Sequence, residues 1–395
     1  MAKLTVGDIE ISGKKVLMRV DFNVPLDENG NVSDDTRIKA ALPTINYVIE
    51  NNAELILVSH LGRPGGGVVE GLKMDVVARR LEELLGRKVQ KLNDCIGAEV
   101  EEAVRTSGKG DVILLENVRF HEEEEKNDPH FAGKLAKLAD VFVNDAFGTC
   151  HRAHASTEGV ARILPAVAGF LVEKELKYFQ GAFENPLRPF AAILGGAKLA
   201  GKIEVIENLI DKVNVILIGG GMAYTFLKAK GLDIGDSLFD ESRLELAGNL
   251  QKKADKAGIQ FLLPVDHVVA DDFSASAKIK NTEGSEIASG WRGMDIGQAT
   301  VKRFIEVLKD AGTVMWNGPL GVCEFAPFSA GTMAVAEYLS GSDAVTILGG
   351  GDTAAAVNTF GLASHFNHVS TGGGASLEFM EGKDLPGIVI LKEKI

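Results

Sequence analysis

The sequence predicts an α/β protein with two doubly wound, Rossmann-like lobes, each built on a parallel sheet. Short apolar runs alternate with segments of helical periodicity along the whole chain, as they do where crossover helices join parallel strands. The length of 395 residues exceeds what a single core usually organises, so two domains are expected. The residues that follow the strands are polar and basic in the first half and rich in glycine in the second half.

Nine apolar runs are predicted as strands: 16–24, 54–59, 112–115, 141–144, 191–194, 213–218, 261–265, 313–316 and 345–348. Between them lie segments with apolar residues at helical spacing, such as 76–85. Parallel sheets covered by helices bind their ligands at the carboxyl ends of the strands. The residues that directly follow each run therefore form the candidate site.

A helix-like stretch at 173–183 is the expected boundary between the lobes. It ends before Pro186 and Pro189, which cannot continue a helix, and it precedes the change in strand-end residues. We therefore expect a first lobe at 1–170, a hinge helix at 171–184 and a second lobe at 185–375.

Charge, hydropathy and cysteine usage disfavour several classes of protein. The net charge of −13 argues against a nucleic-acid partner, and no apolar run is long enough to span a membrane. The N-terminus lacks the apolar region of a signal peptide, and three scattered cysteines fit a reducing cytoplasm. Cys150, His151 and His154 lack a second pair of ligands, so a metal site there is disfavoured.

Basic residues follow successive strands in the first half. They are Arg37, His60, Arg63, Arg119 and Arg152. Any one of them is readily explained as a solvated side chain, but five at corresponding strand ends indicate a shared rim. Guanidinium groups bind carboxylate and phosphate oxygens bidentately, so the pattern predicts a site for a small, multiply charged anion. The acidic run Glu122–Glu125 is expected to be a solvated face.

In the second half the predicted strands run directly into glycines. This occurs at 195–196, 219–221 and 349–351, and at Gly318 after an intervening Asn317. A further glycine run, 372–374, lies near the end of the chain. A strand that ends in glycines before a helix directs unpaired N–H groups and the positive helix end at one place, which suits phosphate. The recurrence of this turn predicts a site for nucleotide phosphates.

Two lysines follow the first of these glycine turns. Lys198 and Lys202 stand four residues apart, so we expect them to share one helix face beside the glycines. The spacing from Gly196 to Lys202 also fits a Walker A loop. Ile203 occupies the position of the Ser or Thr that binds Mg²⁺ in that loop, so a P-loop is rejected.

Two interpretations compete for 349–354. The pattern G-x-G-x-x-A is also the dinucleotide fingerprint, which requires an acid at the end of the next strand, and here no acid occurs until Glu378. Asp352, directly after the glycines, is better placed to hold Mg²⁺ beside phosphates. It is also suited to cap the helix that follows.

Nine sequence blocks together resemble phosphoglycerate kinases of the bacterial type. They read MRVDFNVP, SHLGRP, LLENVRFH, NDAFGTCHRAHAS, ILGGAKLAGKI, GGGMAYTF, WNGPLGVCEF, ILGGGDTAAA and HVSTGGGASLEF, and they cover essentially the whole chain. The resemblance implies two doubly wound lobes, with 376–395 returning to pack on the first. It implies reversible phosphoryl transfer from 1,3-bisphosphoglycerate to MgADP, giving 3-phosphoglycerate and MgATP in glycolysis.

The resemblance also implies site residues. By matching motifs, the phosphoglycerate site comprises Asp21, Phe22, Asn23, Arg37, His60, Leu61, Gly62, Arg63, Arg119 and Arg152. The nucleotide site comprises Gly195, Lys198, Lys202, Gly219, Gly220, Asn317, Glu324, Gly350, Gly351, Asp352 and Thr353, with Asp352 at the metal and Glu324 near the ribose. The expected catalytic residues are Arg37, Lys198, Gly350 and Gly373, with Gly372 and Gly374 completing the second glycine turn.

The implied reaction needs no general base, because its nucleophile is already an anion. It needs in-line alignment and neutralisation of the charge that spreads over the phosphoryl oxygens. The two ligands belong to different lobes, so we expect closure about the hinge helix and the segment near 372–377. The resemblance further implies a cytoplasmic monomer.

Two rival functions stay open. An NAD-dependent oxidoreductase is disfavoured by the missing ribose acid, and a catalytically silent nucleotide-binding regulator is disfavoured because Arg37, Lys198 and Asp352 are all present. Small departures from the family pattern stand at Gly201, Cys323 and Cys150. Cys150, close to Arg152, is hypothesised to be sensitive to oxidation.

Overall fold

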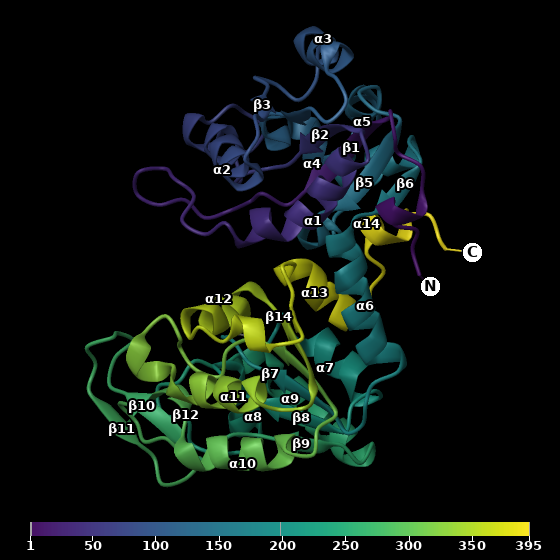
Figure 1. Cartoon of the computed structure of the whole chain (residues 1–395). Helices are drawn as coiled ribbons and strands as arrows, with labels where there is room; N and C mark the ends of the chain where they lie inside the picture. Colours follow the sequence, from purple (N-terminus) through teal and green to yellow (C-terminus); the bar gives the residue numbers. More distant parts are fainter. Residues whose placement is uncertain (1, 198, 395) are drawn as a thin grey trace. The chain divides into compact units, whose positions relative to one another are not determined.

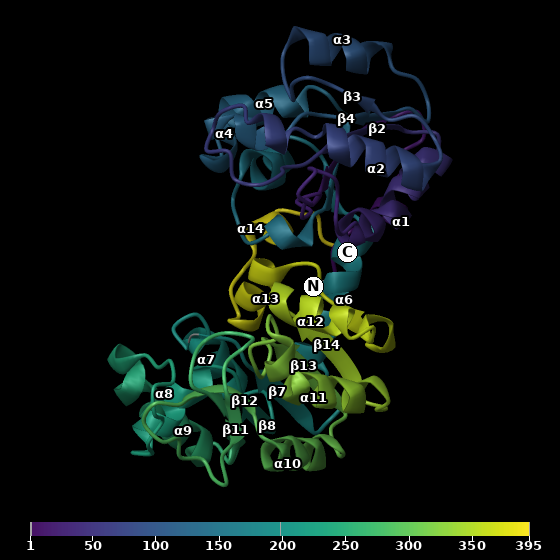
Figure 2. The same ribbon diagram turned by 90° about the vertical axis from the view of Figure 1, so that its left-hand side faces the viewer.

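The computed structural model describes residues 2–197 and 199–394. The chain divides into two compact units, Met1–Leu176 with Asp384–Ile395, and Lys177–Lys383. Each unit contains a six-stranded sheet whose strands all pair in parallel, with helices packed on both faces (Figures 1 and 2). The predicted fold class, two doubly wound parallel-sheet lobes, is therefore confirmed.

The sheet of the first unit has the strand order β3-β4-β2-β1-β5-β6. Its strands are β1 Lys15–Val20, β2 Glu54–Val58, β3 Gln90–Lys91, β4 Val112–Leu114, β5 Val141–Asp145 and β6 Ala166–Ala168. Its longer helices are α1 Thr36–Glu50, α2 Asp75–Leu85, α3 Ala98–Thr106 and α5 Pro129–Ala136. The side chains of β1 are buried on both sides because the strand lies between β2 and β5 and is covered by helices.

The sheet of the second unit has the strand order β15-β14-β13-β7-β8-β9. Its strands are β7 Phe190–Leu194, β8 Val215–Ile218, β9 Gln260–Leu262, β13 Thr313–Asn317, β14 Val345–Gly349 and β15 His368–Val369. Its helices are α7 Ile203–Ile210, α8 Met222–Ala229, α9 Leu244–Lys256, α10 Gln298–Leu308, α11 Ala330–Ser340, α12 Gly351–Thr359 and α13 Gly373–Met380. The core between sheet and helices is centred on Trp316 and Phe304, both fully buried.

All nine predicted strands exist, but the sequence pattern missed others. The run predicted at 16–24 ends at Val20, and β3, β6 and β15 were too short to stand out as apolar runs. A separate antiparallel sheet of β10 His267–Ala270, β11 Ile279–Asn281 and β12 Arg292–Ile296 was also missed. Its strand β11 is exposed and carries little apolar signal.

The division between the units falls within α6 Phe170–Glu184, the helix predicted as the hinge. The segment that returns to the first unit begins at Asp384, whereas the sequence predicted a start at 376. It joins the first unit through backbone hydrogen bonds: Gly387 N donates to Cys150 O at 2.9 Å, and Lys392 N donates to Ala166 O at 3.1 Å. Within the described ranges, none of the helices is both long and apolar enough to cross a bilayer.

Asp145 ends β5 with its carboxylate fully buried at the start of α6. Its Oδ1 accepts a hydrogen bond from Leu171 N at 2.9 Å, and burial raises the pKa of Asp145 from 3.8 to about 7. The folded state therefore holds a proton that the unfolded state has lost between these pH values, and stability falls as pH rises through this window.

We expect Asp145→Asn to be more stable than the parent at pH 8, by at most about 4 kcal/mol, and less dependent on pH. Asparagine keeps the acceptor for Leu171 and removes the buried charge. Urea unfolding at pH 5 and pH 8 measures both effects. An equally steep pH dependence in the variant would show that another group is responsible.

Candidate active site

The predicted basic rim of the first unit is a set of linked loops at the carboxyl ends of β1, β2 and β4. Arg37, at the start of α1, donates from Nη1 to Asp21 Oδ2 at 2.7 Å. Gly62 N donates to Asn23 Oδ1 at 2.8 Å, and Arg119 Nη1 donates to Gly62 O at 2.9 Å. The loops after three different strands are thereby fixed to one another.

The basic groups of the rim lie within electrostatic reach of one another. Burial lowers the pKa of His60 well below its usual value, with further depression by the positive charges of Arg19, Arg119 and Arg37. The pKa of His154 falls to about 4, mainly through burial and then through the neighbouring arginines, which include Arg152. The two imidazoles are therefore neutral at pH 7, and the arginines supply the positive charge.

Three of the predicted phosphoglycerate-site residues do not contribute a buried polar or charged side chain to the rim. Arg63 lies at the end of β2, but its side chain is exposed. Phe22 and Leu61 are buried as whole residues, so neither offers a side chain to a ligand. The Phe22 N–H is already occupied, because it donates to Ser59 Oγ at 2.9 Å.

Sequence reasoning missed Arg19, which is buried beneath the rim. Its Nη2 donates to His60 Nδ1 at 3.1 Å, which leaves the proton of the neutral imidazole on Nε2, and its Nε donates to Ser156 Oγ at 2.8 Å. Ser156 in turn donates from N and Oγ to the Glu124 carboxylate, at 2.8 and 2.6 Å. Arg19 thereby fixes the ring orientation of His60.

The expectation that Glu122–Glu125 is a solvated face is wrong for Glu124. Glu124 is fully buried, and the positive charge of Arg19 acts on it in the low-dielectric interior. A buried guanidinium needs a carboxylate within reach, since an unpaired charge there is strongly destabilising. The signal for this arrangement was an arginine within the apolar run 16–24.

The hypothesis that Cys150 is sensitive to oxidation is wrong. Its thiol is buried, and burial raises the pKa of Cys150 far above the usual range, so the reactive thiolate does not form. Asn144 Nδ2 donates to Cys150 Sγ at 3.5 Å and to Gly387 O at 2.9 Å. Cys150 therefore belongs to the surface on which the returning segment packs.

In the second unit, Lys202 connects the ends of β7 and β13. Its Nζ donates to Gly195 O at 2.6 Å and to Asn317 O and Oδ1, both at 2.8 Å. Helix α7 begins only at Ile203, so the prediction that Lys202 shares a helix face with Lys198 is wrong. Lys198 itself lies outside the described residues.

Most glycine turns do not offer free N–H groups to a ligand, contrary to the prediction. The N–H groups of Gly195, Gly196, Gly219 and Gly220 donate to the carbonyls of Asn317, Pro319, Leu194 and Leu320. The glycines are needed for close backbone packing instead. A Cβ at Gly195 would lie 2.1 Å from Pro319 O, and one at Gly220 would lie 2.5 Å from Gly196 N.

The exceptions are the starts of α12 and α13. Gly350 precedes α12 with φ 89°, and Gly351, Asp352 and Thr353 form its first turn, whose N–H groups have no partner within the helix. Asp352 is exposed in that turn and is not the N-cap. A Cβ at Gly373 would lie 3.4 Å from Gly351 N, so the two helix starts adjoin.

Thr353 and Glu324 have different surroundings. Thr353 is buried, and its Oγ1 accepts from Gly318 N at 2.7 Å, which fixes the loop after β13. Glu324 is exposed further along the same loop. The Asp352 carboxylate fits a Mg²⁺ bound mainly by nucleotide phosphates, since Mg²⁺ commonly takes one or two protein carboxylates and completes its shell with phosphate and water.

A cavity of ≈580 Å³ adjoins the glycine turns, and sequence reasoning missed it. It is lined by Ala197, Leu199, Thr225, Leu238, Phe239, Asp240, Glu241 and Ser242. Leu238 and Phe239 are exposed apolar side chains, at 55% and 38%. Two adjacent exposed apolar residues between Asp236 and Asp240 were the available signal. An apolar wall beside phosphate-binding turns is the composition of a pocket for a planar ring.

Comparison with known proteins agrees with this geometry. A family model described as phosphoglycerate kinase matches residues 6–383. Phosphoglycerate kinases from Gloeothece citriformis and Moorella thermoacetica are each 56% identical, over 400 and 394 aligned residues, with 100% of this chain and of the relative covered. The solved phosphoglycerate kinase from Coxiella burnetii superposes with a TM-score of 0.89 at 42% identity, covering 98% of both chains.

A more distant relative has the same fold. The crystal structure of phosphoglycerate kinase from Pyrococcus horikoshii gives a TM-score of 0.83 at 33% identity, covering 99% of this chain and 98% of that one. The match extends over both units and over the loops that carry the rim and the glycine turns. The chain therefore belongs to the phosphoglycerate kinase family.

Proposed function

We propose that this chain catalyses reversible phosphoryl transfer between 1,3-bisphosphoglycerate and ADP, giving 3-phosphoglycerate and ATP. The observation that carries the proposal is the match of 56% identity over the whole chain with phosphoglycerate kinases. The two units supply the two halves of such a site: a rim of buried and partly buried arginines in the first, and adjoining helix starts in the second.

The phosphoglycerate is bound, in this proposal, by the rim of the first unit. The guanidinium groups of Arg37, Arg119 and Arg152 take up the phosphate and carboxylate charges. Neutral His60, held by Arg19 with its proton on Nε2, donates a hydrogen bond to the ligand. The exposed Arg63 contributes long-range attraction more than orientation, because a solvated charge is screened.

The nucleotide is bound by the second unit. Its base occupies the cavity at Leu238 and Phe239, and its phosphates lie against the first turn of α12, where the N–H groups and the helix dipole favour anions. Asp352 holds the Mg²⁺ that accompanies the nucleotide and neutralises phosphate charge. Lys202, Asn317 and Thr353 keep the surrounding loops in place through the hydrogen bonds described above.

Transfer requires alignment and charge neutralisation and no base. The attacking oxygen is a carboxylate in one direction and an ADP phosphate in the other, and both are anionic at neutral pH. Arg37, Lys198 and the amides of Gly350 and Gly373 compensate the charge on the moving phosphoryl group. A unit charge pair about 4 Å apart gains about 4 kcal/mol at an effective dielectric of about 20, so such contacts are effective only when water is excluded.

Because each unit binds one substrate, we infer that the units move relative to each other about α6, so that the phosphoryl group can pass directly.

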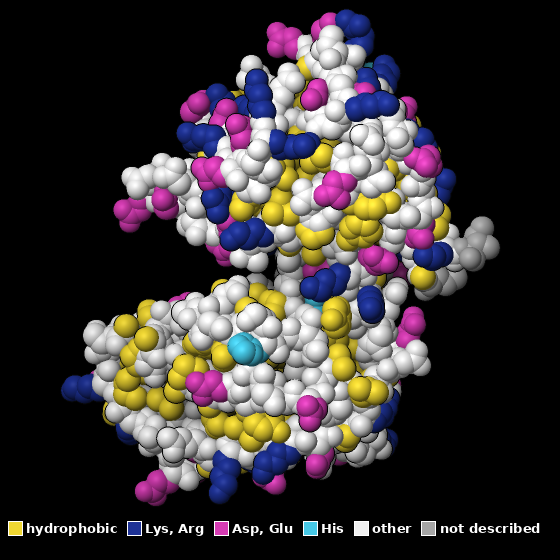
Figure 3. All heavy atoms as spheres, in the orientation of Figure 1, with side chains coloured by type: hydrophobic (Ala, Val, Ile, Leu, Met, Phe, Trp, Pro, Cys, Tyr) yellow, Lys and Arg dark blue, Asp and Glu magenta, His cyan; other side chains and the backbone are white. Residues whose placement is uncertain are grey.

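We also propose a monomer in the cytoplasm. Three free cysteines fit a reducing compartment. On the face drawn in Figure 3, acidic and basic side chains are interspersed, which supports small-molecule ligands over nucleic acid.

The proposal is tested by coupling ATP-dependent phosphorylation of 3-phosphoglycerate to NADH oxidation through a dehydrogenase, with and without Mg²⁺. We expect turnover that requires 3-phosphoglycerate, ATP and Mg²⁺ together. Folded protein that binds ATP without turnover would instead identify a silent regulator. An Asp352→Asn variant serves as the matched control, because it removes the carboxylate charge while keeping the shape of the first turn of α12.

Nucleotide binding is expected to take up a proton at Lys202. Burial lowers the pKa of Lys202 to about 7, and the negative charge of Asp352 opposes this only in part. Above pH 7 the neutral amine can donate only two of the three hydrogen bonds described above, and a bound phosphate favours the ammonium form, which donates all three. ATP binding at pH 8 should therefore take up at most about one proton, and binding should weaken as pH rises above 7. Calorimetry in buffers of different ionisation enthalpy measures the uptake.

The matched control is Lys202→Gln, which retains a donor but does not titrate. Proton uptake at pH 8 should disappear in this variant. Uptake of equal size in the parent and the variant would assign the proton to another group.

A further inference from the structure

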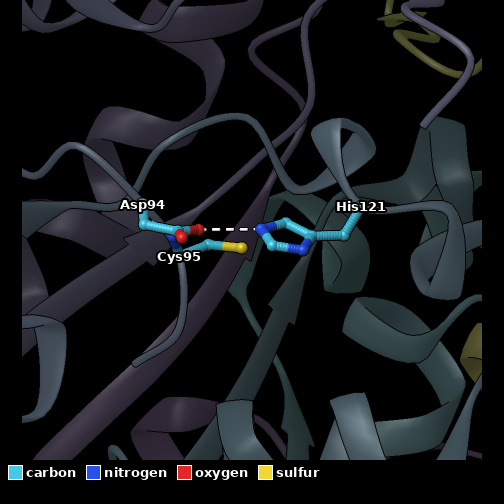
Figure 4. A group of neighbouring side chains, drawn as sticks. All are labelled: Asp94, Cys95 and His121. Carbon is cyan, nitrogen blue, oxygen red and sulfur yellow. Dashed lines mark hydrogen bonds and ion pairs between the residues drawn. The ribbon is translucent and has the colours of Figure 1, made fainter. Parts of the chain in front are cut away.

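A carboxylate, a thiol and an imidazole converge in the first unit, and the proposed reaction uses none of them. Asp94 and Cys95 lie in the loop between β3 and α3, and His121 directly follows the short helix η3 Val118–Phe120 (Figure 4). One ligand atom from each residue lies within 4.8 Å of the other two. No other group of three such residues converges in this way in the part of the chain that the structure describes.

Backbone and ring contacts hold the three side chains in place. Cys95 N donates to Asp94 Oδ1 at 2.6 Å, and Glu116 N donates to Asp94 O at 3.3 Å, which fixes the loop against the end of β4. The His121 ring packs against Phe131 with ring centroids 5.2 Å apart. Its Nε2 lies 2.8 Å from Asp94 Oδ1. The ligand atoms are thus brought together by the fold before any ligand arrives.

The cluster has a buried side and an open side. Cys95 is completely buried, whereas the side chains of Asp94 and His121 remain 52% and 26% exposed. The cluster is therefore open to solvent at Asp94 and His121 and closed at the sulfur, so a cation meets the oxygen and nitrogen ligands first. A water molecule can complete its coordination on the exposed side.

We propose that Asp94, Cys95 and His121 bind a thiophilic divalent cation of the Zn²⁺ class. Cys, His and Asp side chains all bind Zn²⁺, and three protein ligands with a fourth position left to water is the pattern of an open zinc site. The sulfur ligand selects against Mg²⁺ and Ca²⁺. Zn²⁺ bonds of about 2.0 Å place two tetrahedral ligand atoms about 3.3 Å apart, so Asp94 Oδ1 and His121 Nε2, which lie 2.8 Å apart, must separate slightly around the metal.

Binding is a proton-for-metal exchange. Burial raises the pKa of the Cys95 thiol well above its usual value, so its proton leaves only as the cation takes its place on the sulfur. The proton between Asp94 and His121 leaves as Nε2 coordinates the metal. The hydrogen bond between these two residues is then replaced by bonds to the metal. The cation joins the loop after β3 to the segment after η3, so it stabilises the folded unit by mass action.

The test is titration of tag-free, nucleotide-free full chain with Co²⁺, followed by displacement with Zn²⁺. We expect one equivalent of Co²⁺ with a thiolate-to-cobalt charge-transfer band, lost when Zn²⁺ is added and unaffected by excess Mg²⁺. Co²⁺ bound at Asp352 gives no sulfur band, so the outcome is independent of the proposed catalytic site.

Cys95→Ser and His121→Gln should each weaken binding by more than the about 10- to 100-fold typical of losing an outer hydrogen-bond partner. Cys323→Ser, which changes a partly exposed cysteine outside the cluster, should bind as the parent does. Circular dichroism checks that each variant is folded, and His121→Gln carries the test should Cys95→Ser unfold. Absence of the band in the parent, or an equal band in Cys95→Ser, would overturn the proposal.

Discussion

Replacing Arg37 with alanine is expected to lower kcat for 3-phosphoglycerate phosphorylation by about 100- to 1,000-fold, the range for losing one preorganised donor to developing charge. Binding of ATP should stay unchanged, because Arg37 lies in the first unit and the nucleotide is assigned to the second. Steady-state kinetics and calorimetric titration with ATP measure the two quantities.

Two control variants separate charge from geometry. Arg37→Lys keeps the positive charge but loses the planar fork that meets Asp21 at 2.7 Å, so we expect it to recover only part of the rate. Arg63→Ala removes an exposed charge of the same rim and should raise KM more than it lowers kcat. Thermal unfolding of Arg37→Ala checks that the lobe remains folded when Asp21 has lost its ion-pair partner. Normal turnover of Arg37→Ala would remove Arg37 from the transfer step.

Gly195→Ala is expected to destabilise the second unit by about 3 kcal/mol or more, the upper range for overpacking. The added Cβ would lie 2.1 Å from Pro319 O and 2.6 Å from Gly318 O, and these backbone atoms cannot turn aside as a side chain can. A backbone movement that relieved this clash would also separate the Lys202 ammonium from the Gly195 carbonyl, so ATP binding should be lost as well. Denaturant unfolding and ATP titration measure the two effects.

Gly351→Ala is the matched control for Gly195→Ala. A Cβ at Gly351 meets nothing within 4 Å, and the residue lies in the first turn of α12, so stability should change by less than about 1 kcal/mol. The methyl group would nevertheless occupy the approach to the N–H groups proposed to bind phosphate, and ATP affinity should fall at least about tenfold. Equal stability of the two variants would contradict the packing role of Gly195.

The sequence patterns that predicted the fold were those that depend on burial alone. Strands such as β1 and β13 are buried along nearly their whole length because helices cover both faces of the sheet. The resulting run of mostly apolar residues is visible without any knowledge of neighbours. Strand β11 is exposed and paired only at the edge of a small sheet, so its formation depends on partners distant in sequence.

The candidate site was predictable at the level of residue types and not of contacts. Basic residues after strands indicated the rim, whereas the link from Arg19 through Ser156 to Glu124 joins three segments far apart in the chain. Lys202 was expected on a helix because it stands four residues after Lys198, but α7 begins only at Ile203 and the Lys202 Nζ is held by the carbonyl groups of two strand ends. Such contacts follow from the tertiary arrangement and leave no periodic pattern.

Because of the returning segment, the two units can complete their folding at different stages of synthesis on the ribosome. The second unit is continuous from 177 to 383, so all of its contacts are available once that stretch has emerged. The first unit is synthesised earlier but needs residues from 384 onward, where Leu4 N meets Lys392 O and Gly387 N meets Cys150 O. While the second unit is translated, the surface around Cys150 on which residues 384 onward pack is still exposed. The first unit is then incompletely folded, and this surface is available to chaperones.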